Sequence, residues 1–396
     1  MSNKWKSSTL AEITTRITDG SHNPPKGIEQ SEFLMLSSKN VLDDEIHFDN
    51  PRYLSADDFS LEHRRTTVAE GDVLLTIVGT IGRTAVVPGN TPLFALQRSV
   101  AVIKPRIDHV HPRFLMLALM HGADRLNDKA RGVAQKGIYL EALREFTVRH
   151  PSLHEQQRIV AILDEAFDCI ATAKANAEKN LQNARALFET YLSSMLLSKR
   201  WQWKTIGDVC EKVEYGSSAK SKVEGSVPVL RMGNIQDGYL DWEKLLYSDD
   251  RAEIEKYSLR KGDVLFNRTN SPELVGKAAI YDDDRAAIFA GYLIRIHRRQ
   301  DLLDAKYLTY FLNSKIALDY GKTVMISSVN QANINGTKLK AYPIPLPLLI
   351  EQRKIVSRLD VLVTETQRLE SIYQQKLAAM DELKKSLLHQ AFSGAL

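Results

Sequence analysis

The chain has 396 residues, of which 43% are hydrophobic and 26% are charged, and its formal net charge is +4 at pH 7. These values fit a folding chain of two or three domains, and the weak positive charge permits a nucleic-acid partner without demanding one. No run of eighteen apolar residues occurs, so no membrane-spanning helix is predicted. The first ten residues lack an apolar segment, so no secretory signal is predicted. We therefore expect a cytoplasmic protein without a membrane partner.

Residues 1–151 predict a globular head of short strands, turns and a few helices, which we name head 1. An apolar run at 73–78 follows a Gly-Asp pair, and a second strand is expected at 99–103. Residues 113–119 predict a short helix with a leucine-rich face. Together these elements indicate an α+β domain.

Two stretches of head 1 invite an enzymatic interpretation. Asn23-Pro24-Pro25 is similar to the catalytic loop of an amino-methyltransferase, but that loop needs an aromatic residue next, to stack a flipped adenine, and Lys26 stands there. The segment 79–84, GTIGRT, lacks the Gly-Lys-Ser/Thr ending of a phosphate loop. The first stretch is interpreted as a turn, and the second as either a turn or a close backbone approach to a ligand.

Residues 152–200 predict a long helix because 152–206 contain neither proline nor glycine. Apolar residues recur at steps of three and four, as in a coiled coil. The residues expected in this seam are Ile159, Leu163, Ile170 and Leu181.

The second half of the chain repeats the first. HEQQRIVAILDEA from His154 returns as IEQRKIVSRLDVL from Ile350, at a displacement of 351 − 155 = 196 between Glu155 and Glu351. Residues 201–346 therefore predict a second α+β domain, head 2, and 347–396 a second long helix. Its expected seam residues are Ile355, Leu359, Leu369 and Leu377.

This repetition predicts the architecture. Two α+β heads would be related by pseudo-two-fold symmetry and separated by a long antiparallel two-helix coiled coil. A helix of roughly 43 residues spans about 64 Å at a rise of about 1.5 Å per residue. The helices would thus act as a spacer between the heads.

No catalytic site is predicted. Cys169 and Cys210 have no Cys or His at metal-ligand spacing, and the ten histidines pair with no acid or cysteine at productive spacing. Asp304-Ala305-Lys306 is similar to the end of a nuclease motif but opens a predicted helix. We expect no catalytic residue, no metal and no cofactor in this chain.

Two unequal heads on a fixed spacer suit double-stranded DNA, whose grooves repeat along a long axis. Polar and basic residues gather in matched turns of both heads, and Arg and Asn pair well with guanine and adenine edges. The candidate DNA-binding residues are Ser21, His22, Lys39, Asn40, Gly79, Arg83 and Arg98 in head 1, and Arg231, Asn234, Arg268, Asn270 and Lys277 in head 2.

The chain resembles the specificity subunit (HsdS) of Type I restriction-modification systems along essentially its whole length. The residues that carry the resemblance are DGSHNPPKG near the start, EGDVLLTIVGTIGRTAVV, the EQ opening of each helix, and the terminal LKKSLLHQAFSGAL. Head 2 departs from this pattern, because Gly216-Ser217-Ser218-Ala219 replaces the first signature and the glycine turn at 270–276 is three residues longer.

The resemblance implies a non-catalytic subunit that reads a bipartite, asymmetric DNA site with half-sites about one DNA turn apart. It implies two copies of an adenine-N6 methyltransferase subunit that carries S-adenosylmethionine. It also implies two copies of a translocase-endonuclease subunit that uses ATP and Mg. Three alternatives stay open: a modification-only system, an enzyme that methylates by itself, and a coiled-coil scaffold that reads no sequence.

Overall fold

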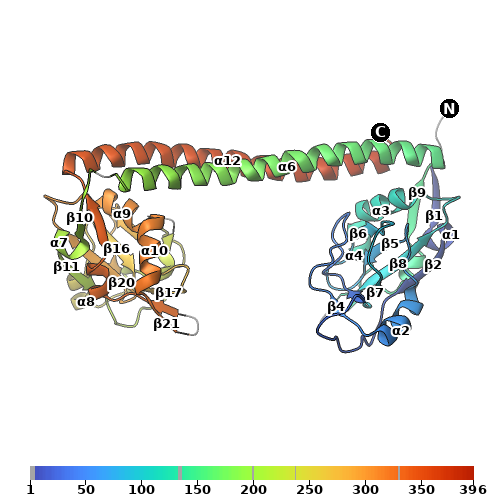
Figure 1. The fold of residues 1–396 in the computed structure, drawn as a ribbon, viewed down its shortest axis with the longest axis horizontal. Helices are drawn as coiled ribbons and strands as arrows, with labels where there is room; N and C mark the ends of the chain where they lie inside the picture. Colours follow the sequence, from blue (N-terminus) through green and yellow to red (C-terminus); the bar gives the residue numbers. More distant parts are fainter. Residues whose placement is uncertain (1–4, 133–135, 199, 237, 329–330) are drawn as a thin grey trace. The chain divides into compact units, whose positions relative to one another are not determined.

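The computed structural model describes residues 5–132, 136–198, 200–236, 238–328 and 331–396. The chain divides into two compact units. Unit 1 contains Met1–Asn176 and Gln375–Leu396, and unit 2 contains Ala177–Gln374. Each unit therefore combines one head with parts of both long helices, and each is described by itself (Figure 1).

Head 1 is built on a four-stranded antiparallel sheet in the order β2-β8-β5-β6 and a three-stranded sheet in the order β4-β3-β7, in which β3 and β7 are parallel. A further pair, β1 with β9, is antiparallel. The strands are β1 (Lys6–Thr9), β2 (Thr14–Asp19), β3 (Leu34–Leu36), β4 (Arg52–Tyr53), β5 (Val73–Thr76), β6 (Thr84–Val86), β7 (Phe94–Leu96), β8 (Val100–Pro105) and β9 (Thr147–His150). The helices are α1 (Leu10–Ile13), α2 (Ala56–Thr66), α3 (Pro112–His121), α4 (Ala123–Asp128) and α5 (Leu140–Arg144).

Head 2 repeats this topology. Its four-stranded sheet has the order β11-β20-β16-β18, its three-stranded sheet has the order β15-β12-β19, and β10 pairs with β23. These strands are β10 (Gln202–Thr205), β11 (Cys210–Tyr215), β12 (Val227–Leu230), β15 (Leu246–Ser248), β16 (Asp263–Asn267), β18 (Ala278–Tyr281), β19 (Ile288–Phe289), β20 (Leu293–Arg298) and β23 (Pro343–Leu346). The same bulge interrupts β2 at Thr14 and β11 at Cys210. The sequence repeat therefore corresponds to two heads with the same fold.

The remaining elements of head 2 complete its loops and cover its sheet. The helices are α7 (Ile206–Val209), α8 (Arg251–Tyr257), α9 (Ala305–Asn313), α10 (Lys315–Val324), α11 (Gly336–Lys340) and the short η1 (Met232–Asn234). The additional strands are β13 (Ile235–Gln236), β14 (Tyr239–Leu240), β17 (Thr269–Asn270), β21 (Ile326–Ser328) and β22 (Gln331–Asn333). Asp304 caps α9, since its carboxylate accepts hydrogen bonds from the N–H groups of Lys306 and Tyr307 at 2.9 and 3.1 Å. Its role is structural, as a helix cap requires.

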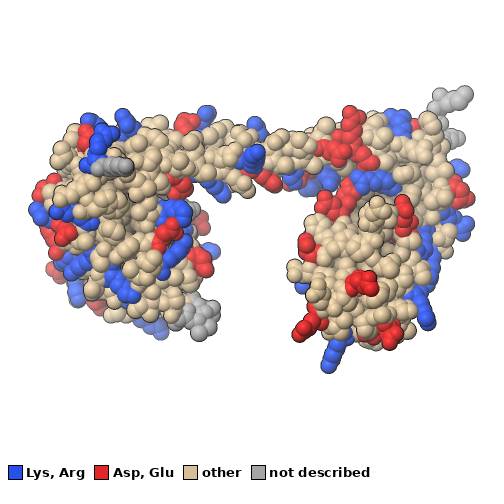
Figure 2. Space-filling model, in the orientation of Figure 1, with Lys and Arg blue, Asp and Glu red and all other residues tan. Residues whose placement is uncertain are grey.

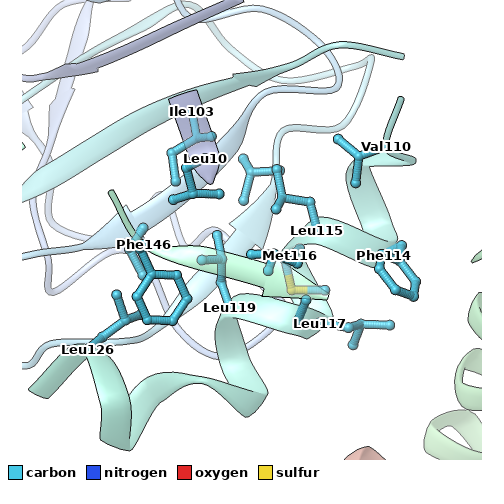
Figure 3. Packing of buried hydrophobic residues seen from close by; sticks show 14 of the residues in the cluster. Leu10, Ile103, Val110, Phe114, Leu115, Met116, Leu117, Leu119, Leu126 and Phe146 are labelled. Carbon is cyan, nitrogen blue, oxygen red and sulfur yellow. The ribbon is translucent and has the colours of Figure 1, made fainter. Parts of the chain in front are cut away.

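The core of head 1 centres on α3. Pro112 opens this helix and Gly122 follows its end, while six consecutive residues from Phe114 to Leu119 are buried. Figure 3 shows Phe114, Leu115 and their neighbours packed with residues of the sheet. The prediction of a short helix at 113–119 and of α+β heads is confirmed.

The two long helices are α6 (Leu153–Leu196) and α12 (Leu349–Ser393), of 44 and 45 residues. In unit 1 they run antiparallel, because Arg158 donates to the carbonyl of Leu396 at 3.1 Å while Lys174, further along α6, pairs with Asp381 at 2.7 Å. In unit 2, Arg185 pairs with Glu370 at 2.6 Å. The later Leu192 and Leu196 of α6 share a core with the earlier Ile355 and Leu359 of α12, so the direction is again antiparallel.

The predicted seam is only partly a contact between helices. Ile159, Leu163 and Ile170 are buried in the core of head 1, together with Leu388 and Ala391 of α12. Ile355 and Leu359 are buried in the core of head 2 in the same way. Leu181, Leu369 and Leu377 are half-buried. The predicted seam residues therefore make two kinds of contact, because those near the ends of the helices pack in the cores of the heads.

Candidate nucleic-acid interface

Three predicted residues of head 1 lie in three loops that meet at Ser99. The hydroxyl of Ser99 accepts a hydrogen bond from the N–H of Ser38 at 3.0 Å, next to Lys39, and its carbonyl accepts one from Ile77 at 2.9 Å. Arg98 precedes Ser99, and Arg83 follows the glycine turn after β5. Tertiary structure therefore gathers Lys39, Arg83 and Arg98, which are separated in the sequence by 83 − 39 = 44 and 98 − 83 = 15 positions.

These three side chains are available to a ligand. Lys39 and Arg98 are exposed and Arg83 is half-buried. Within the described ranges, no hydrogen bond or ion pair engages their charged groups. Flexible cations on loops at one end of a sheet suit contacts with phosphates or base edges.

The glycine turn of head 1 has the backbone shape of a tight turn. Gly79 and Gly82 both have positive φ, of 83° and 98°. A Cβ at Gly82 would lie 2.8 Å from the Cβ of Ala123, so this position requires glycine on two counts. Gly79 is exposed, and its N–H donates to the carbonyl of Lys136 at 3.3 Å within the head.

The first signature positions a loop. Ser21 is buried, its N–H donates to the carbonyl of Leu96 at 2.7 Å, and its own carbonyl accepts from the N–H of Arg98 at 2.8 Å. His22 is half-exposed and bonds Asp19 at 2.7 Å, which also pairs with Arg65. Ser21 thus holds the backbone that carries Arg98, whereas His22 contacts Asp19.

Asn40 turns its amide into head 1. Its Oδ1 accepts a hydrogen bond from the N–H of Ser37 at 3.0 Å, and its Nδ2 donates to the carbonyls of His47 and Asp49, at 3.1 Å each. The residue is 5% exposed. Its amide is engaged within the head and does not face a ligand.

Asn234 repeats this network in head 2. Its Oδ1 accepts from the N–H of Arg231 at 2.9 Å, and its Nδ2 donates to the carbonyls of Asp241 and Glu243 at 3.0 and 3.2 Å. The amides of Asn40 and Asn234 are thus engaged within their own heads, and contact of these two residues with DNA stays a prediction. They position the loops that bear the neighbouring basic residues.

Three predicted residues of head 2 line one hollow of about 280 Å³. Arg231, Asn270 and Lys277 share it with seven residues that the sequence analysis missed: Met232, Gly233, Ile235, Gln236, Asn267, Leu274 and Tyr292. The hollow lies where Arg268 donates its N–H to the carbonyl of Tyr292 at 3.0 Å, which repeats the bond from Ile77 to Ser99 in head 1. The candidate residues of both heads thus occupy matching places.

Arg268 stays close to its own head. Its guanidinium donates to the carbonyl of Gly291 at 3.2 Å and lies 4.8 Å from the ring centre of Tyr215. These contacts hold the side chain half-buried. A role in supporting the loops fits this geometry better than a direct base contact.

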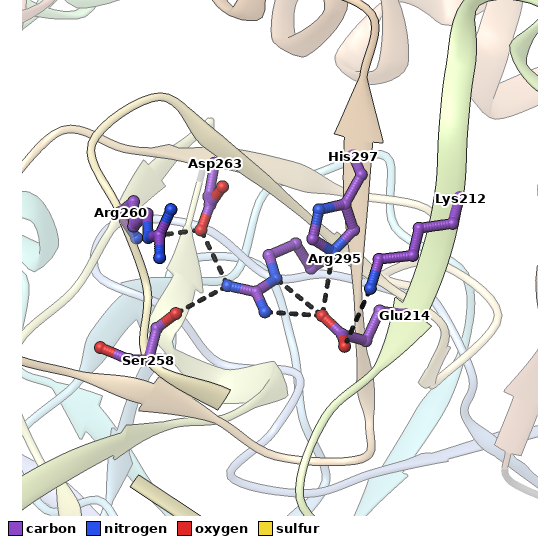
Figure 4. Close-up of polar contacts among 7 residues, drawn as sticks. All are labelled: Lys212, Glu214, Ser258, Arg260, Asp263, Arg295 and His297. Carbon is purple, nitrogen blue, oxygen red and sulfur yellow. Dashed lines mark hydrogen bonds and ion pairs between the residues drawn. The ribbon is translucent and has the colours of Figure 1, made fainter. Parts of the chain in front are cut away.

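An ion-pair network joins three strands of the head 2 sheet (Figure 4). Arg295 bonds Glu214 at 2.6 Å and Asp263 at 3.1 Å, and His297 bonds Glu214 at 2.9 Å. Partial burial by itself would raise the pKa of Glu214, but the hydrogen bonds from Arg295 and His297 outweigh it and lower the pKa to about 2. Because Asp263 belongs to the Gly-Asp motif, that motif has a structural role.

Ion pairs also attach each head to a long helix. Figure 2 shows acidic and basic side chains gathered where head 1 meets the helices. Arg113 of α3 bonds Asp44 and also Asp164 of α6, the latter at 2.8 Å. In head 2, Lys306 of α9 pairs with Asp360 of α12 at 2.9 Å. The same joint therefore occurs twice.

Among the described residues, no group of three or more His, Cys, Asp or Glu side chains could hold a metal ion. Cys169 is exposed and Cys210 is buried, and both are free thiols. A search of the described helices for one long and apolar enough to cross a membrane found none.

A model of the family described as Type I restriction modification DNA specificity domain matches residues 48–183 and 198–377. A Methanocaldococcus jannaschii protein assigned as the type I restriction enzyme MjaX specificity subunit is 30% identical over 197 residues, 49% of this chain and 45% of the relative. The type I restriction enzyme EcoKI specificity subunit of Escherichia coli is 26% identical over 264 residues, 62% of this chain and 57% of the relative. The chain thus spans about half the length of these curated relatives.

Two solved structures share the fold. One is a chain from the structure that describes complex assembly and conformational transition of the type I R-M system, with 20% identity and a TM-score of 0.77, covering 99% of this chain and 98% of that one. The other is the crystal structure of the HsdS subunit from Thermoanaerobacter tengcongensis, with 20% identity and a TM-score of 0.57, covering 100% and 98%. At this identity they establish the architecture alone.

Proposed function

Because this chain belongs to the Type I restriction modification DNA specificity domain family, we propose that it is the specificity subunit of a Type I restriction-modification complex and reads a bipartite, asymmetric DNA site. In such systems the specificity subunit is non-catalytic and catalysis lies in other subunits, which confirms the expectation that this chain is not an enzyme. A complex that reads the host's own DNA works in the cytoplasm, where we place it.

The observation that carries the proposal is the pair of matching loop sites on two heads of the same topology. In head 1 the site has the exposed Lys39 and Arg98 and the half-buried Arg83. In head 2 the matching loops form a hollow lined by Arg231, Asn270 and other polar residues. The two heads share a topology but carry different side chains at the matching loops, which supports the proposal that they read two different half-sites.

Each head would divide its contacts between phosphates and bases. Flexible, exposed cations such as Lys39 and Arg98 suit phosphate oxygens, which fix register without reading sequence. Groups held at a fixed position suit base edges, because hydrogen-bond direction then discriminates. The Asn40 and Asn234 networks keep the loops rigid enough for such discrimination.

The long helices would set the gap between half-sites. Both α6 and α12 contain residues of both units. About 44 residues at a rise of about 1.5 Å span about 66 Å, and we expect half-sites about one DNA turn apart.

The helices would also bind the other subunits. Apolar side chains are exposed on them, among them Leu187 at 62% and Val361 at 65%. We propose that the two repeated halves recruit two methyltransferase subunits, which carry S-adenosylmethionine, and two translocase-endonuclease subunits, which use ATP and Mg. A partner set without the nuclease would make the same chain part of a modification-only system.

The test is sequencing of modified bases in the host's DNA with this gene present and deleted. Loss of N6-methyladenine from one split, asymmetric motif upon deletion is expected. An unchanged pattern, together with equal retention of all duplexes from a random pool by the purified complex, would favour a scaffold that reads no sequence.

A further inference from the structure

The hollow of head 2 contains a buried acceptor without a partner. Asn267 ends β16 and is 1% exposed, and its Oδ1 makes no hydrogen bond within the described structure. Its Nδ2 lies 3.3 Å from the carbonyl of Met232, so the amide cannot be turned over without setting oxygen against oxygen. The unpaired atom is therefore the oxygen, and it needs a donor.

The matching residue of head 1 has no such need. Thr76 ends β5 and occupies the same place, since the N–H of Thr76 bonds Arg83 at 2.9 Å as that of Asn267 bonds Lys277 at 2.8 Å. The hydroxyl of Thr76 accepts from the N–H of Arg83 at 3.0 Å and donates to its carbonyl. The unpaired acceptor is thus a feature of head 2 and not of the shared frame.

Leaving a buried acceptor without a donor destabilises a folded protein, so a bound ligand that supplies the donor would be favoured at this place. Arg231 also lines this hollow, and its buried Nε makes no hydrogen bond within the part of the chain that the structure describes. A ligand that fits both must carry a donor beside an acceptor. The major-groove edge of a base pair has this pattern, with the amino group of adenine or cytosine next to carbonyl and N7 acceptors.

We propose that this hollow is the base-reading subsite of head 2, and that the Oδ1 of Asn267 accepts a hydrogen bond from the exocyclic amino group of an adenine or cytosine. This inference rests on the proposed function and names the residue that decides one position of the half-site. Leu274 and Tyr292, which are 41% and 48% exposed, line the same hollow. Guanine and thymine offer acceptors alone on their major-groove edges and are refused.

The experiment compares the wild-type chain with Asn267→Thr, which installs the residue of head 1. Each is expressed with the host's methyltransferase in a strain without this gene, and the methylated motif is read by sequencing. One position of the head 2 half-site should prefer adenine or cytosine by about tenfold or more in the wild type and lose that preference in the variant. The head 1 half-site and the gap should not change, which shows within the same molecule that the variant folds and assembles.

A second measurement tests the atom itself. Duplexes in which that base lacks its exocyclic amino group should bind the wild-type complex less tightly, and the variant should bind both duplexes equally. Thr76→Ser in head 1, which keeps the satisfied hydroxyl, serves as the matched control. A variant motif identical to the wild-type motif, or equal loss with the altered duplex for both chains, would overturn the subsite while leaving the proposed function standing. Absence of any motif with the wild-type chain would instead overturn the proposed function.

Discussion

Gln156 accepts a hydrogen bond from the main-chain N–H of His111 at 2.8 Å, across the joint between α6 and head 1. The Nε2 of Gln156 also donates to the carbonyls of His109 and Pro151 at 3.1 and 3.0 Å. Gln352 makes the same set of bonds in the second half, to the N–H of Asp304 and two carbonyls. Both glutamines are fully buried. The glutamine of the repeated Glu-Gln pair thus attaches each long helix to its head through hydrogen bonds.

Replacing Gln156 by Ala should destabilise unit 1 by about 1–3 kcal/mol, because one N–H and two carbonyls lose their partners in a buried place. The free energy of unfolding, measured with urea, tests this. Gln157→Ala on the exposed side of the same turn is the control and should change little. Equal stability of the two variants would contradict the role given to Gln156.

Leu163→Ala should lower stability by about 2–5 kcal/mol, because the side chain is fully buried in the core of head 1. Hydrogen exchange should show the loss of protection in unit 1, with unit 2 protected as before. Leu187→Ala lies on the same helix with a 62% exposed side chain and should have little effect on folding. Loss confined to the contact between helices, with head 1 intact, would instead support a pure coiled-coil seam.

The Glu214 network should make the stability of head 2 depend on pH. The folded pKa of Glu214 is lowered from 4.5 to about 2, so its stabilisation is present above the unfolded pKa and is lost as pH falls from about 4.5 toward 2. This shift corresponds to at most about 3 kcal/mol of stabilisation, and screening by solvent reduces that amount. Glu214→Gln should remove this slope in thermal unfolding measured from pH 6 to pH 2.5, whereas Glu211→Gln, at an exposed position of the same strand, should keep it.

Gly20→Ala and Gly216→Ala should each destabilise their own head by about 1–3 kcal/mol or more, because overpacking forces the backbone to move. A Cβ at Gly20 would collide with the carbonyl of Leu96, and one at Gly216 with the carbonyls of Phe289 and Ala290. Gly233→Ala is the control, since a Cβ there meets no atom within 4 Å. Melting temperatures that fall equally for all three variants would contradict the close approach.

Four residues inserted in α6 after Asn176 and in α12 after Gln374 add about one helical turn, or 6 Å, where the two units divide. The contacts inside each unit are then kept. The gap between half-sites should grow by roughly one or two base pairs while the bases read stay the same, as motif sequencing would reveal. Changed bases with an unchanged gap would show that the helices do not set the spacing.

The sequence by itself determined the repeat, the α+β character of the heads, the two long helices and the family. These features are written in local signals, namely a displacement near 196 residues, long stretches without proline or glycine, and linear motifs such as the Gly-Asp pair. Such signals can be recognised in the sequence because each depends on a local pattern of residues.

Tertiary structure decided which side chains face a ligand. Asn40 and Lys39 are neighbours in sequence, yet the first is buried with its amide engaged while the second is exposed. Leu163 has the spacing of a coiled-coil residue but packs in the core of a head. Asn267 and Tyr292 meet Arg231 in one hollow although they are far apart in the chain. The physical reason is that burial and hydrogen-bond satisfaction depend on contacts between distant segments, which no local pattern encodes.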